Sequence, residues 1–492
     1  MIVLGLIVLP LIVAAVVALL SNRIAKTIAL AGTLLELVLG VYAFCLYKSS
    51  MQTGIFDLAL NWHTGWLPQL GSDFFIQIDG INILLVILAV LLLPFIVLSS
   101  FNREIKDAKA FYVLMLLMQS ALVGVFVAKD AFLFYIFWEL ALIPIYFICL
   151  LWGGEGRQRI TFKFFVYTLA GSLFMLLALI YLALHTNPVT FDMLAIYHAG
   201  ASLPLNEQVL VFGAMYLAFA IKIPIFPLHT WQPDTYVSAP TQGTMLLSGI
   251  MLKMGAFGLI RWLIPVVPQA WEHMMHWVIL VSVISVVYGS LMAIAQKDFK
   301  RLLAYSSMGH VGLIAAGIFA WNLPGVQGSL FQMLSHGINV VGLFFVCDII
   351  INRMKTDSIA SLGGIRNVQS LFAVLFMVIM LGSVALPLTN GFVGEFMLLN
   401  GIFQYQYIFA GVAGLTVILG AVYMLRAYHC MMHGPANELT GTFSKLLTSE
   451  KIVLYGIVVL VIALGVYPKV MLDVTEPAVR SLIDYVHTVS KV

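Results

Sequence analysis

Long apolar segments follow one another along the whole chain, and they constrain the fold more than any other feature. Runs of about 17–25 apolar residues are long enough to cross a bilayer as helices, while only 10% of the 492 residues are charged. Lipid offers no polar partner to the backbone, so each crossing segment must satisfy its own hydrogen bonds as a helix. No stretch between these runs is long enough to bury a separate core. We therefore predict an all-α polytopic membrane protein.

About fourteen crossing helices can be delimited in this way. They are expected at residues 3–20, 27–47, 76–100, 111–128, 131–151, 164–186, 207–227, 240–262, 275–294, 302–320, 329–350, 370–388, 405–427 and 452–468. The loops after the odd-numbered helices hold most of the 25 lysines and arginines. Basic loops stay in the cytoplasm, so these loops are predicted to be cytoplasmic. An even number of helices then leaves both termini outside.

Two of the apolar segments contain residues that interrupt a helix. Lys222 is followed closely by Pro224 and Pro227, and a second interruption lies at Pro387 and Gly391. Proline removes a backbone donor and clashes with the preceding turn, and paired breaks in two halves are typical of transporters with inverted repeats. We predict two inverted five-helix repeats, made by helices four to eight and nine to thirteen. The expected domains are 1–110 (helices one to three), 111–262 (first repeat), 275–427 (second repeat) and 428–492 (loop, helix fourteen and tail).

Four charged residues in apolar stretches are singled out: Glu139, Lys222 and Lys253 lie inside expected crossing helices, and Glu395 lies in the apolar stretch LPLTNGFVGEFMLLNGIF. A charge at mid-bilayer costs roughly 2.5–3.5 kcal/mol, so it normally faces a partner or a wet cavity and marks an ion path. A buried lysine can exchange its proton near neutral pH, because burial disfavours its charged form. Glu139 could control this exchange at Lys222, although a static ion pair is the alternative. Glu395 could release protons, or it could cap the helix that follows the second break.

Histidines and cysteines add a weaker signal. His229, His310 and His336 fall within or beside apolar segments, and histidine can bridge two proton carriers; each could equally be a hydrogen-bonded packing residue. The four cysteines form no CxxC pair, whereas zinc and iron–sulfur sites need several thiolates at close spacing. We expect no metal, cluster or other cofactor in this chain.

Five segments resemble, in order and spacing, the antiporter-like membrane subunits of respiratory complex I, and among these the M type (type 4 in mitochondria). The resemblance extends from about residue 79 to about residue 428. The segments are FWELALIPIYFICLLWGG, PLHTWQPDTYVSAPTQGTMLLSGIMLKMGAFGLIRW, KDFKRLLAYSSMGHVGLI, QMLSHGINVVGLFF and NGFVGEFMLL.

This resemblance implies a role for each candidate residue. Glu139 matches the glutamate that pairs with the lysine at Lys222, Lys253 matches the central lysine, and Glu395 matches the exit glutamate. The three histidines match those of the polar axis between the half-channels. Tyr236 and Ser238 stand where the family often has a histidine and an acidic residue, so the resemblance implies no carboxylate role in that loop.

The resemblance also implies a function and partners. The chain would translocate protons through its Lys, Glu and His residues, coupled to quinone reduction elsewhere in an NADH–quinone oxidoreductase. NAD, FMN, iron–sulfur clusters and quinone would belong to partner subunits, L-like and N-like paralogues would be neighbours, and the location would be a bacterial inner membrane. A sodium/proton antiporter subunit, a membrane-bound hydrogenase subunit and a structural spacer with inert ion pairs remain the alternatives.

Overall fold

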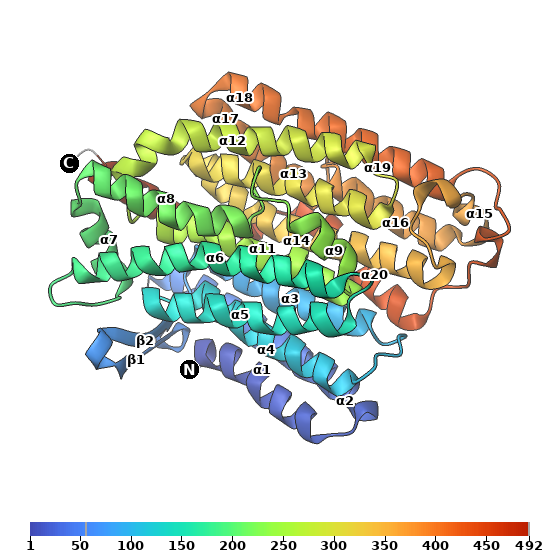
Figure 1. The fold of residues 1–492 in the computed structure, drawn as a ribbon, viewed down its shortest axis with the longest axis horizontal. Coiled ribbons are helices and arrows are strands. Elements are labelled where there is room, and N and C mark those ends of the chain that lie inside the picture. The colour runs from blue at the N-terminus through green and yellow to red at the C-terminus, as the bar shows by residue number, and fades with distance from the viewer. Residues whose placement is uncertain (55–56, 491–492) are drawn as a thin grey trace.

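The protein is a bundle of long, roughly parallel helices (Figure 1). The computed structural model describes residues 1–54 and 57–490. Its helices are α1 Ile2–Leu19, α2 Asn22–Thr53, α3 Ile83–Ser99, α4 Ala108–Val127, α5 Ala131–Trp152, α6 Arg157–Leu184, α7 Met193–Ser202, α8 Leu205–Lys222, α9 Gln232–Ser238, α10 Thr241–Leu246, α11 Leu252–Gly258, α12 Pro268–Ala295, α13 Phe299–Phe319, α14 Leu323–Met354, α15 Ile365–Val368, α16 Ser370–Ser383, α17 Asn390–Tyr405, α18 Tyr407–Ala413, α19 Leu415–Met432, α20 Thr448–Val466 and α21 Lys469–Val489. The two strands are β1 Asn61–Leu67 and β2 Ser72–Gln77.

A helix overlaps every segment that was expected to cross the membrane. Among the described residues, 11 helices are long and apolar enough to cross a bilayer, and two shorter apolar helices are α3 and α16. The helical membrane class is therefore confirmed. The number of 14 crossings and the repeat boundaries stay predictions.

Both expected helix breaks are present. α8 ends at Lys222, and irregular backbone continues from there to the start of α9. α16 ends at Ser383, and α17 begins at Asn390. Between them, Ala385 and Leu388 have φ angles of 57° and 73°, which are incompatible with a right-handed helix. Each break thus leaves a charged residue close to a helix end inside the bundle.

The core of the bundle is formed by three segments. The helical segment Thr241–Leu263 is buried along its whole length, and α13 and α14 are 94% buried. In the outer helices α1, α2, α6 and α18–α19, less than half of the most apolar stretch is buried, and the exposed faces are available to lipid or to other chains. The three buried segments carry Lys253, His310 and His336.

Ion pairs agree with the alternating direction of the helices. Where two of the assigned basic residues share one acidic partner, they were assigned to the same side: Lys129 and Arg261 both pair with Asp79, and Lys163 and Arg301 both pair with Asp234. Figure 1 shows the start of α1, the β-hairpin and α7 towards one end of the bundle and α15 at the other. We call these the hairpin end and the basic end; the basic end holds the loops predicted to be cytoplasmic.

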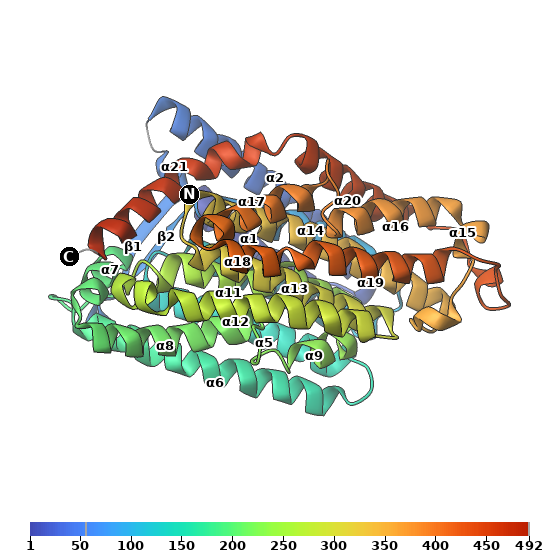
Figure 2. The same ribbon diagram turned by 90° about the horizontal axis from the view of Figure 1, so that it is seen from above.

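The elements that were not predicted from the sequence include the β-hairpin and α21. Strands β1 and β2 form an antiparallel hairpin whose register pairs Asn61 with Gln77. Helix α21 lies obliquely to the bundle axis (Figure 2) and buries one apolar side, which includes Val479 and Ile483. The hairpin and the start of α21 both lie beside α3, so they close the hairpin end around the first residues of that helix.

Candidate functional site

The site lies along the middle of the bundle, where four helices bring buried titratable groups together. Lys253 on α11, His336 on α14, His310 on α13 and Glu395 on α17 form a continuous series of side chains, which we call the central relay. All four are at most 5% exposed. Glu139 on α5 and Lys222 at the end of α8 lie towards the first repeat.

Lys253 is held by an unusual stretch of helix. Two π-helical turns, Leu247–Met251 and Leu259–Leu263, flank the short helix α11; such turns are rare and occur often at functional sites. The Lys253 ammonium donates a hydrogen bond to the Ser248 carbonyl and lies 2.9 Å from His336 Nδ1. The sequence offered no partner for this lysine, and the fold supplies one from a helix 83 residues away.

The other half of the relay is a contact between a histidine and a carboxylate. His310 Nδ1 lies 2.8 Å from Glu395 Oε1, at an angle that makes it an ion-pair contact rather than a hydrogen bond. Gln332 Nε2 donates to the same carboxylate oxygen at 3.4 Å. Glu395 lies six residues inside α17, so it acts on His310 and does not cap the helix after the break.

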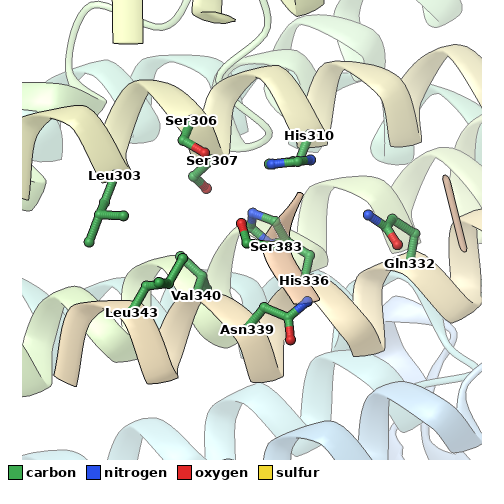
Figure 3. A pocket seen from close by; sticks show the side chains of 10 residues that line it. All are labelled: Leu303, Ser306, Ser307, His310, Gln332, His336, Asn339, Val340, Leu343 and Ser383. Carbon is green, nitrogen blue, oxygen red and sulfur yellow. The ribbon is translucent and has the colours of Figure 1, made fainter. Parts of the chain in front are cut away.

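A small polar cavity separates the two halves of the relay. The His310 and His336 rings are 5.8 Å apart between centroids, and the cavity beside them has a volume of about 10 Å³. Figure 3 shows Ser306 and Ser307 from α13 and Asn339 from α14 projecting into this space. His336 Nε2, Ser307 Oγ and Asn339 Oδ1 have no hydrogen-bond partner in the protein. About this much room, with several unpaired polar atoms, suits one water molecule.

Glu139 and Lys222 are near each other but are not joined. Lys222 is 2% exposed, and its Nζ lies 5.3 Å from the centroid of the Trp138 ring, within cation–π range. The Glu139 carboxylate acts on the lysine electrostatically, but no ion pair within 4.0 Å links them, and Glu139 Oε1 has no hydrogen-bond partner. Glu139 is only partly buried, next to the exposed Leu140 on the outer side of α5. The structure therefore shows an open arrangement of the predicted pair.

Of the three predicted relay histidines, His229 is the one that lies outside the central relay. Its ring packs against Phe226 and Tyr288, with centroids 5.7 and 5.0 Å away, and its Nδ1 is unpaired. No hydrogen bond or ion pair within the described part of the chain joins it to Lys222 or Lys253. The packing interpretation of this histidine is the one that its contacts support.

A second group of charges lies at the hairpin end, and we call it the outer charge cluster. The Asp79 carboxylate is 2.5 Å from Lys129 Nζ and 2.6 Å from Arg261 Nη2. Burial acts to raise the pKa of Asp79, but the positive charges of Arg261 and Lys129 outweigh it and hold the pKa below its ordinary range. Burial, together with the adjacent Arg261 guanidinium, lowers the pKa of Lys129 to about 8. The cluster ties the start of α3 to the end of the helical segment that carries Lys253.

Among the charged residues inside the bundle that sequence reasoning missed is Glu36. Glu36 on α2 is 1% exposed and accepts a hydrogen bond of 3.0 Å from Gln119 Nε2 on α4. Its signal was the same as that of the four residues singled out, namely a charge within a long apolar run. It lies among α1, α2 and α4, outside both predicted repeats.

The described residues contain no group of three or more His, Cys, Asp or Glu side chains that could hold a metal ion. The four cysteines are unpaired; Cys149 and Cys347 are buried, and Cys45 and Cys430 are exposed. The candidate site consists of the titratable side chains described above.

A buried series of Lys, His and Glu between two helix breaks defines a class of ion-translocating membrane protein. A family model described as NADH:quinone oxidoreductase/Mrp antiporter, TM, matches residues 128–420, which hold every residue of the central relay. The chain therefore belongs to the NADH:quinone oxidoreductase/Mrp antiporter transmembrane family.

The most similar relatives that we report are M-type (type 4) subunits, which confirms the resemblance seen in the sequence. NADH-quinone oxidoreductase subunit M of Rickettsia conorii is 40% identical over 419 residues, which are 85% of each chain. NADH-ubiquinone oxidoreductase chain 4 of Marchantia polymorpha is 33% identical over 486 residues, 98% of this chain and 97% of that one. A chain of respiratory complex I from Thermus thermophilus with bound NADH has a TM-score of 0.91 at 29% identity, covering 99% of this chain and 100% of its own.

Proposed function

We propose that the chain translocates protons as an M-type subunit in the membrane arm of a respiratory NADH–quinone oxidoreductase. The observation that carries the proposal is the central relay, in which Lys253 touches His336 and His310 touches Glu395. Contacts of 2.8–2.9 Å between titratable groups are within the reach that proton transfer requires. One water in the central cavity would join the two contacts into a single line.

Each predicted residue except His229 then has a place along this line. Glu139 controls the charge on Lys222, and Lys222 passes its proton towards Lys253 through internal water. Gly255 helps to bring the two lysines' helices together, because a Cβ at this position would lie 2.9 Å from the Phe219 carbonyl oxygen of α8. From Lys253 the proton moves to His336, then through the cavity water to His310, and finally to Glu395, which releases it.

The proposal assigns redox chemistry to other chains. NAD, FMN, iron–sulfur clusters and quinone would be bound by partner subunits, and the energy of quinone reduction would reach this chain as a change in the Glu139–Lys222 separation. The partly buried position of Glu139, next to the exposed Leu140 on the outer side of α5, supports such control, because a neighbouring subunit could reach it. The proposal also includes L-like and N-like partner subunits and a location in a bacterial inner membrane. For the chain itself it includes 14 membrane crossings, two inverted repeats and external termini.

The test is to replace Lys253 by Met, which keeps the length and the burial of the side chain but removes the proton. We expect the assembled complex to lose the protons that pass through Lys253, measured as a lower number of protons translocated per NADH oxidised in inverted membrane vesicles. Lys451→Met, at an exposed position at the start of α20, is the matched control. An unchanged ratio in the Lys253→Met variant would refute the proposal.

A further inference from the structure

A pair of buried hydroxyl groups lies between the central cavity and the basic end of the bundle. Tyr423 OH on α19 lies 2.8 Å from Ser306 Oγ on α13. Both side chains are at most 3% exposed, and neither belongs to the central relay. Hydroxyl groups both donate and accept hydrogen bonds, so the pair can pass a proton in either direction.

On its inner side, this pair reaches the relay. Ser306 lines the central cavity together with His310 and His336, and Figure 3 shows it one helical turn from His310 on the same side of α13. Tyr423 is also close enough to the Glu395 carboxylate to interact with it electrostatically. The hydroxyl pair therefore meets the relay at the His310–Glu395 contact.

On its outer side, the pair reaches the surface at the basic end. Tyr423 lines a separate pocket of about 100 Å³ between the ends of α12, α13 and α19. Lys297, Arg426 and the exposed Cys430 line the same pocket. Its volume has room for several water molecules. One side chain thus joins a wettable surface pocket to the relay.

We propose that Tyr423 and Ser306 form a second proton-uptake branch, which supplies the His310–Glu395 pair directly from the basic end and bypasses Glu139 and Lys222. The inference rests on the proposed function. In the transfer, Tyr423 accepts a proton from water in the surface pocket while its own hydroxyl proton passes to the Ser306 oxygen. Ser306 in turn gives its proton to the cavity water beside His310. Both hydroxyls end neutral and rotate back before the next proton arrives.

Two substitutions in the assembled complex test the branch, each with a matched control. Tyr423→Phe and Ser306→Ala remove only a hydroxyl group, and we expect each to lower the number of protons moved per NADH oxidised. Because the two hydroxyl groups act in series, the double variant should move as many protons per NADH as the more impaired of the two single variants. Tyr428→Phe, whose hydroxyl binds the Ala373 carbonyl on α16, and Ser290→Ala, whose hydroxyl binds the Val286 carbonyl within α12, should keep the full ratio.

A parallel branch also predicts how losses combine. Adding Tyr423→Phe to Glu139→Gln should reduce pumping further than either change alone, because the two uptake routes are separate. Because the branch enters at His310, beyond Lys253, an active branch should leave Lys253→Met with residual pumping that added Tyr423→Phe removes. If Lys253→Met lowers the ratio while Tyr423→Phe behaves like Tyr428→Phe, the branch is refuted and the proposed function stands. If Lys253→Met pumps normally, both are refuted.

The exposed thiol of Cys430 allows a second test that needs no change at the relay. In a Cys45→Ala background, a membrane-impermeant maleimide added to the basic face of inverted vesicles should label Cys430, fill the surface pocket and lower the ratio of protons per NADH to that of Tyr423→Phe. The same treatment of a Cys430→Ser variant should have no effect. Labelling confirmed by mass spectrometry without a loss of pumping, or labelling only from the opposite face, would overturn the branch.

Discussion

Replacing Asp79 by Asn tests how firmly the outer charge cluster fixes the helix that carries Lys253. The carboxylate is the shared partner of Lys129 and Arg261, whose side chains are only 5% and 6% exposed. Removing one member of a buried ion pair leaves an uncompensated charge and costs about 3–5 kcal/mol. Asparagine keeps an oxygen for the backbone N–H of Ile81, which donates to Asp79 at 2.9 Å, so the change isolates the loss of charge.

The loss of stability in Asp79→Asn can be compared with the loss caused by the same substitution in an exposed ion pair. Asp73 binds His63 at the surface, with side chains 49% and 53% exposed, so Asp73→Asn should cost less than about 1 kcal/mol. We expect Asp79→Asn to lower the thermal midpoint of the purified complex by several degrees and Asp73→Asn to leave it unchanged. Adding Lys129→Met to Asp79→Asn should recover part of the loss, because it removes one of the two unpaired charges. Equal midpoints for Asp79→Asn and the unaltered complex would refute this account of the cluster.

Two further predictions concern buried titratable groups. Burial lowers the pKa of Lys129 from 10.5 to about 8, so the folded chain binds fewer protons than the unfolded chain between these two pH values. The free energy of unfolding should therefore rise by about 3 kcal/mol as the pH increases through that window. Thermal midpoints measured against pH should show this rise in the unaltered complex and not in the Lys129→Met variant. Glu36→Ala should lower the free energy of unfolding by about 1–3 kcal/mol, because it leaves the Gln119 amide without its hydrogen-bond partner. Glu36→Gln should have a thermal midpoint close to that of the unaltered complex. Equal midpoints for the two variants would contradict the role of this hydrogen bond.

The helices and their interruptions could be predicted because they depend on local sequence. A run of apolar residues must form a helix in lipid whatever surrounds it, and Pro227 and Pro387 interrupt a helix through their own geometry. Glu139, Lys222, Lys253 and Glu395 could be singled out for the same reason, since a charge in such a run is unusual in any fold. Glu36 satisfied the same rule and was overlooked.

The contacts of the site could not be predicted from local sequence. His336 meets Lys253 because the helical segment Thr241–Leu263 and α14 are packed together in the core, and nothing near either residue specifies that pairing. For His229, in contrast, local sequence predicted a relay contact that the described residues do not form. A polar residue beside a break predicts a relay role, yet its ring lies against Phe226 and Tyr288.

The β-hairpin was missed because its signal is short and mostly polar. Strand β1 contains Trp62 and His63 among small and polar residues, and strand β2 runs directly into the apolar stretch that becomes α3. A prediction based on long apolar runs therefore assigned the end of β2 to the third helix. The hairpin forms only because its two strands pair with each other.

The two π-helical turns around Lys253 make chain length a constrained quantity in this segment. An α-helix turns by about 100° for each residue, so one residue gained or lost between Leu247 and Lys253 would carry the ammonium about a quarter of the way round the helix, away from α14. Side chains in this stretch are free to vary as long as they fit the core. The number of residues is not, because it sets the direction in which the lysine points.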